Sequence, residues 1–110
     1  MEFGSLHDFW QTHSDQFTWP FLPSRFLYDC YYAWCQSANL APLYTTQIAF
    51  SRAIKKYVHH STTQWHYQPQ ARRFYPTYSP LVNQYRLSEW GTHRPPIRCH
   101  GFLYRKDDKQ

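Results

Sequence analysis

Residues 24–58 constrain the fold most, because two stretches of helical periodicity stand there with only a short connector between them. The first stretch carries one apolar stripe at three- and four-residue spacing, formed by Leu27, Cys30, Tyr31, Trp34, Cys35 and Ala38. Ser24 is suited to cap the start of this helix, and Asn39 to end it in a left-handed conformation. The pattern therefore predicts a first helix between these two residues.

The second stretch follows Pro42 and Leu43, and a threonine at 45 or 46 can cap its start. The helix is expected to reach about Val58. The side chains expected to face the core are Phe50, Ala53, Ile54 and Tyr57. The side chains left facing outward are Gln47, Ser51, Arg52, Lys55 and Lys56. The second helix is therefore amphipathic, with a basic, polar outer face.

The remaining segments point to a mixed fold. Residues 6–17 predict a short helix with Ser5 as its cap, while 63–67 and 97–104 alternate as strands do. Between the strands lies a long proline-containing stretch, in which residues 83–88 are a weaker strand candidate. A helical pair followed by two strands predicts an α+β winged helix-turn-helix, with N-terminal helices and a β-hairpin that has a long wing.

The chain length of 110 residues suits one domain. Residues 1–5, Met-Glu-Phe-Gly-Ser, match the products of two common cloning sites and are interpreted as a cloning remnant on a domain excised from a larger protein. We expect an N-terminal helix and linker over 6–23, the winged-helix domain over 24–106, and a frayed tail over 107–110.

The charge distribution points to an anionic partner. No acidic residue stands between Asp29 and Glu89, although six cations do, and the formal net charge is +5. Such a balance favours nucleic acid or an anionic membrane. No apolar run is long enough to span a bilayer, so a membrane partner is not expected. Three cysteines, an odd number, favour a reducing compartment such as the cytoplasm.

Motifs of catalysis and of metal binding are missing from the sequence. It contains no Cys-x2-Cys, His-Glu-x-x-His or Gly-x-Ser-x-Gly, and only three glycines, too few for a phosphate-binding loop. Asp29 stands alone on its helix, so paired carboxylates for acid–base chemistry are missing as well. We therefore expect no metal, no cofactor and no enzymatic activity in this domain.

A DNA-binding surface can be assigned residue by residue. The candidate residues are Thr45, Thr46, Gln47, Ser51, Arg52, Lys55, Lys56, Arg72, Arg73 and Tyr75. Glutamine suits adenine, arginine and lysine suit guanine, and the two threonines lie where a helix N-terminus can bind phosphate. The arginine pair would sit on the wing, and Tyr75 with Tyr78 would stack on unpaired bases. The alternative is a solvated basic face with tyrosines that only pack an extended loop.

Several segments resemble one family. They are Phe26 to Asn39 with its Trp-Cys end, Pro42-Leu43, Thr46-x3-Phe50-Ser51-x2-Ile54-Lys55-Lys56, and Cys99-His100-Gly101-Phe102-Leu103-Tyr104. Together these are similar to the C-terminal winged-helix domain of phage, plasmid and poxvirus primase–helicases of the superfamily-3 type. The sequence departs from the family pattern at Ser51, usually glycine, at Thr46, usually serine, and in the long insert between the strands.

The resemblance implies a DNA-binding domain of a mobile-element replication protein that recognises duplex origin DNA through the second helix and the wing. Three alternatives stay open: a transcription regulator of the same fold, a binder of single-stranded or forked DNA, and a docking module for replication proteins. A docking module would use exposed aromatics such as Trp10, Trp19 and Tyr78.

Overall fold

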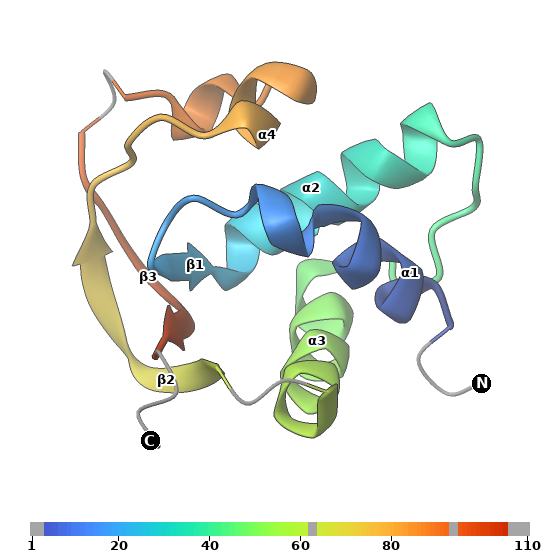
Figure 1. Ribbon diagram of the computed structural model, residues 1–110, viewed down its shortest axis with the longest axis horizontal. Helices are drawn as coiled ribbons and strands as arrows, with labels where there is room; N and C mark the ends of the chain where they lie inside the picture. The colour runs from blue at the N-terminus through green and yellow to red at the C-terminus, as the bar shows by residue number, and fades with distance from the viewer. Residues whose placement is uncertain (1–3, 62–63, 93–94, 106–110) are drawn as a thin grey trace.

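The computed structural model describes residues 4–61, 64–92 and 95–105. The helices are α1 (Gly4–His13), α2 (Ser24–Ser37), α3 (Gln47–Ser61) and α4 (Pro80–Gln84), with 3₁₀ turns at Ser14–Gln16 and Ser88–Trp90. The strands are β1 (Phe21–Pro23), β2 (Trp65–Phe74) and β3 (Ile97–Tyr104). Figure 1 shows the strands on the left of the view and the three longer helices at the centre and right.

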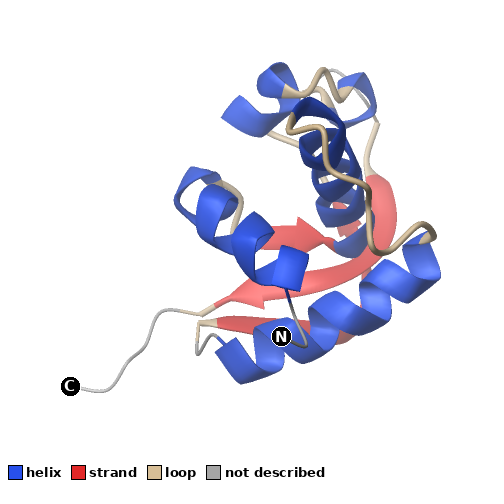
Figure 2. Ribbon diagram, turned by 90° about the vertical axis from the view of Figure 1, so that its right-hand side faces the viewer, coloured by secondary structure: helices blue, strands red, loops and turns tan. Residues whose placement is uncertain are grey.

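The three strands form one antiparallel sheet in the order β1-β3-β2, so β3 is the central strand. Viewed from the side in Figure 2, the strands lie behind the helices. Within the described residues the fold is mixed α+β, with four α-helices and this sheet, and it is compatible with a winged helix. The fold class expected from the sequence is confirmed at this level.

An aromatic core joins the helices to the sheet. Its largest fully buried side chains include Phe9, Tyr31, Phe50, Trp90 and Phe102, each no more than 1% exposed. Aromatic side chains bring 150–250 Å² each, roughly, into such a core, so few residues are needed to fill it. The core therefore takes one or more residues from α1, α2, α3, the β2–β3 segment and β3.

The α2 and α3 predictions are confirmed within a few residues. The apolar stripe of α2 is buried at Leu27, Cys30, Tyr31 and Cys35. Asn39 follows the helix with φ of 60°, in the left-handed region that asparagine tolerates. Ser24 is the first residue of α2 and makes no capping bond, so its expected capping role is wrong.

The N-terminal helix also differs in detail from its prediction. It ends at His13 instead of residue 17, because a 3₁₀ turn replaces the α-helix over the last residues. Ser5 lies inside α1, where its Oγ is 3.1 Å from the Tyr31 Oη, and it is not a cap. The hydroxyl thus ties α1 to α2.

β1 was not expected from the sequence, and it pairs tightly with the central strand. Its three residues, Phe21, Leu22 and Pro23, are opposite Leu103, Phe102 and Gly101. A Cβ added at Gly101 would meet the Leu22 carbonyl oxygen and would lie 2.7 Å from the Pro23 Cα. Glycine is therefore needed here for close approach of two backbones.

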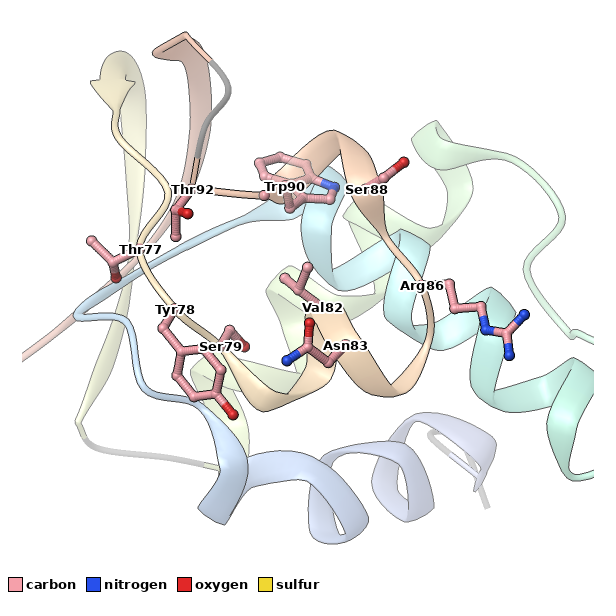
Figure 3. Close-up of a pocket in the computed structure, with 10 residues that line it drawn as sticks. Thr77, Tyr78, Ser79, Val82, Asn83, Arg86, Ser88, Trp90 and Thr92 are labelled. Atoms are coloured by element: carbon pink, nitrogen blue, oxygen red, sulfur yellow. The ribbon is translucent and has the colours of Figure 1, made fainter.

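The segment between β2 and β3 is not a simple wing. Residues 75–96 contain α4 and a 3₁₀ turn, where residues 83–88 were expected to form a strand, and they place Leu81 and Trp90 in the core. We call this segment the insert. An open hollow of about 430 Å³, drawn in Figure 3, lies within the insert and is lined by Thr77, Tyr78, Ser79, Val82, Asn83, Arg86, Ser88, Trp90, Gly91 and Thr92. The strand expected over residues 83–88 is therefore wrong, and the long connection of the hairpin packs into the core.

Long-range hydrogen bonds join the insert to α1, to α2 and to the loop before β1. The Trp19 Nε1 donates to the Thr77 carbonyl at 3.0 Å, and the Trp90 Nε1 donates to the Asp29 carboxylate at 2.9 Å. His13 bonds the Tyr85 hydroxyl at 2.7 Å. These bonds satisfy polar atoms that the aromatic packing would otherwise leave buried without partners.

Candidate nucleic-acid interface

α3 presents its two faces as the sequence predicts. Phe50, Ile54 and Tyr57 are at most 2% exposed and pack into the core. The backbone N–H of Ala49 donates to the Thr46 Oγ1 at 3.1 Å, so Thr46 caps the helix. The cap and the buried face fix the backbone of α3, so they determine which of its side chains face solvent.

A groove lies beside this outer face. Its volume is about 530 Å³, and it is lined by Ser24, Arg25, Gln47, Ser51, Arg52, Lys55, Tyr67, Ile97, Arg98, Cys99 and His100. We call it the α3 groove. Four of the candidate residues, Gln47, Ser51, Arg52 and Lys55, thus stand on one wall, and α2 and β3 supply residues of the others. None of the residues lining it is acidic.

Sequence reasoning missed the three basic side chains that α2 and β3 contribute to the groove, Arg25, Arg98 and His100. Arg98 and His100 both lie exposed on β3, two residues apart and therefore on the same side of the strand. That alternation was visible in the sequence, but it did not reveal which helix the strand would face. Arg25 comes from the first turn of α2, whose position beside α3 depends on the tertiary fold.

One carboxylate from the insert reaches this basic cluster. The Arg25 guanidinium lies 3.2 Å from the Glu89 carboxylate, and both side chains are more than half exposed. In the sequence, Glu89 is the first acidic residue after the acid-free span. In the fold it lies beside Arg25 of the basic groove. An exposed pair of this kind is worth about 0–1 kcal/mol, so a phosphate can compete for Arg25.

Lys55 is held in place at one end of the groove. Its Nζ lies 4.4 Å from the centroid of the Tyr67 ring on β2, a cation–π contact. The contact leaves the ammonium exposed to solvent and orders a side chain that is otherwise flexible. The contact therefore favours a position of the Lys55 charge on the wall of the groove.

The other candidate residues lie outside the groove. Lys56 is exposed on α3, and Tyr75 is 61% exposed just after β2, but neither lines the groove. Arg72 and Arg73 lie in β2, opposite Cys99 and Arg98, and so belong to a strand of the β2–β3 hairpin instead of the proline-containing stretch expected between the strands. The Arg72 guanidinium packs 5.1 Å from the Phe21 ring centroid. Thr45 is exposed, and its carbonyl accepts from the Tyr28 hydroxyl.

Two aromatics suggested for a protein-docking surface are in the core instead. Trp10 is 4% exposed and Trp19 is 3% exposed, since both stack among other rings. Only Tyr78 of that set is exposed, at 64%. The expectation that Trp10 and Trp19 form an exposed docking surface for replication proteins is therefore wrong.

Most of the groups whose pKa is shifted lie in or beside the core and do not line the α3 groove. Burial lowers the pKa of His13, whose Nδ1–H donates to the Phe9 carbonyl at 2.8 Å. Burial raises the pKa of Asp29, against the lowering effect of the bond from Trp90. Burial also raises the pKa of the Cys99 thiol at the groove to about 11, so this cysteine is not a thiolate near neutral pH.

The described residues form neither a cluster of metal ligands nor a helix that could span a membrane. Over 4–61, 64–92 and 95–105, no three histidine, cysteine or acidic side chains gather as metal ligands would. In the same ranges no helix combines the length and apolar character needed to cross a membrane.

Comparison with known proteins identifies the family. A family model described as poxvirus D5 protein-like matches residues 4–90. The chain belongs to this family. The match is consistent with a domain related to the poxvirus D5 primase–helicase and places the chain among replication-associated domains of viral type. No curated protein and no solved structure matches the chain.

Proposed function

We propose that this domain binds duplex DNA through the α3 groove, as the origin-recognising part of a viral-type replication protein. The observation that carries the proposal is the groove itself, where Arg52 and Lys55 of α3 face cations from α2 and β3 with no lining carboxylate. Cations gathered from separate segments on one surface are the footprint of a phosphate backbone.

α3 is the element suited to enter the major groove. It is the second helix of the helix-turn-helix pair, and its first two turns expose Gln47, Ile48 and Arg52. Glutamine can read adenine, arginine can read guanine, and an apolar side chain can contact the thymine methyl group. Base readout would therefore come from α3, and phosphate contacts from the groove walls. The role proposed for this chain is binding, with no catalytic step of its own.

Fluorescence anisotropy with a labelled duplex from the parent element's presumed origin tests this proposal, with a scrambled duplex of equal length as the reference. Three or four neutralised phosphates give a slope of about −3 to −4 for log K against log salt. We expect tight, salt-sensitive binding that prefers the origin sequence. Absence of binding even at low salt would exclude the proposed function.

Arg52→Ala should weaken binding by about 1–3 kcal/mol if the arginine contacts a base. The matched control is Arg86→Asn, which also removes one positive charge. Arg86 lies on the insert, outside the groove, with φ of 57°, where asparagine is well tolerated. Equal losses in the two variants would indicate a general charge effect and would remove α3 from the site.

A further inference from the structure

A second hollow continues the α3 groove toward the end of α3. Its volume is about 530 Å³, and it is lined by Lys55, Val58, His59, Trp65, His66, Tyr67 and Phe102. Lys55 and Tyr67 also line the α3 groove, so the two hollows share a wall. Proteins bind small planar ligands in hollows of this size, roughly 300–1,000 Å³.

The two hollows differ in chemistry. The α3 groove has mostly polar and cationic walls, whereas the second hollow has an apolar floor formed by Val58 and Phe102, each 1% exposed. Its aromatic walls are Trp65 and Tyr67, both half-buried, and the Tyr67 ring packs edge-on to Phe102 with centroids 5.5 Å apart. Trp65 and Tyr67 are two residues apart on β2 and lie on the same side of the strand. An unpaired base can stack against such rings, whereas a base paired in a duplex cannot. At Tyr67 the base would take the place of the Lys55 ammonium, which lies 4.4 Å from the ring centroid.

The rim of the hollow suits the backbone of the same strand. Lys55, His59 and His66 are exposed around the opening, and no acidic residue is among the side chains that line it. Ser51 and His59 are eight residues apart on α3, which is about 12 Å along the helix axis. That length equals roughly three to four base steps, so a strand leaving the groove reaches the hollow within a few nucleotides.

We propose that this hollow binds an unpaired base, so that the domain recognises a junction between duplex and single-stranded DNA. The inference rests on the proposed function, because the duplex portion would occupy the α3 groove. It assigns base stacking to Tyr67 and Trp65 at the end of α3, instead of to Tyr75 and Tyr78, which do not line this hollow. A domain of a replication protein would thereby sit at the point where strands separate.

Anisotropy titrations with five DNA ligands test the junction at one salt concentration. The first three are a blunt duplex, the same duplex with a five-nucleotide 3′ overhang, and the same duplex with a five-nucleotide 5′ overhang. The fourth repeats the overhang that binds more tightly, built from abasic sugars. The fifth is the blunt duplex lengthened by five base pairs. One overhang polarity should bind about tenfold tighter than the blunt duplex, as stacking of one base predicts. The abasic and lengthened ligands should not show this gain.

Tyr67→Leu gives the second measurement, and Tyr78→Leu is its matched control. The ratio of overhang to blunt affinity should fall toward one in Tyr67→Leu and stay near tenfold in Tyr78→Leu. A gain that the abasic overhang retains would overturn the junction proposal, since only phosphates would then be bound. If the domain binds the duplex with sequence preference but gains nothing from an overhang, the junction proposal is wrong and the proposed function stands. If the domain does not bind the duplex at all, both proposals are wrong.

Discussion

α3 and the insert both bury aromatic side chains, but they leave different charges at the surface. On α3 the rings of Phe50 and Tyr57 point into the core and the cations point out. In the insert the Trp90 ring is buried in the core, and the exposed Glu89 carboxylate pairs with Arg25 of the groove. The difference shows that basic composition identifies a binding surface only where regular backbone geometry fixes which side chains face solvent.

The largest expected effect tests whether the insert is part of the core. Trp90→Ala removes a ring that packs on Phe26 and Trp19 and leaves Asp29 without its donor. Stability should fall by about 3–5 kcal/mol, measured by urea denaturation. The control Tyr78→Ala removes a ring that is 64% exposed and should change stability by less than about 0.5 kcal/mol. Equal midpoints for both variants would mean that the insert is not part of the core.

Acidification should loosen the contact between α1 and the insert. The folded pKa of His13 lies below its unfolded value of 6.5, so the unfolded chain binds more protons between the two values. The stabilisation is therefore complete above about pH 6.5 and is lost as the pH falls toward the folded pKa, at about 1.4 kcal/mol for each pH unit in that window.

Denaturation of the natural chain and of His13→Gln over a pH series measures this contribution. On acidification the free energy of unfolding should fall more for the natural chain than for His13→Gln, because only the natural chain carries the buried imidazole. Parallel curves below pH 6.5 would show that another group accounts for the pH dependence.

Ile48 offers a sharper test of base readout by α3. Its side chain is 69% exposed in the first turn, where it can meet a thymine methyl group. Replacing thymine by uracil in the preferred duplex should cost about 0.8 kcal/mol, the value of one buried methyl-sized group. Ile48→Ala should abolish the difference, and Leu43→Ala in the connector should keep it. Persistence of the difference in Ile48→Ala would place the thymine contact elsewhere.

An effect of similar size concerns the one ion pair that links the insert to the groove among the described residues. Glu89→Gln should strengthen duplex binding by up to about 1 kcal/mol, because Arg25 no longer has a competing carboxylate. The gain should vanish in the Arg25→Ala background, as titration of the two single variants and the double variant would reveal. A gain that survives without Arg25 would indicate that Glu89 acts on the whole surface charge.

The sequence predicts α2, α3 and β3 well because their signals are local. Helical spacing identifies Phe50 and Ile54 as buried, and an asparagine in the left-handed region ends α2. β1 has only three residues and is set by pairing with Gly101, some eighty residues later, so no local period announces it. The groove is partly predictable for the same reason: its α3 wall follows from periodicity, but the contribution of Arg25 depends on tertiary packing.

The place of β3 in the sheet has a consequence for how the domain can be formed and divided. β1 and β2 do not pair with each other; each pairs only with β3, whose residues come after both in the chain. During synthesis the helices and the insert are made before β3, so β1 and β2 have no pairing partner until β3 has emerged. A fragment cut at residue 90, where the family match ends, would keep α3 but expose those edges to other chains.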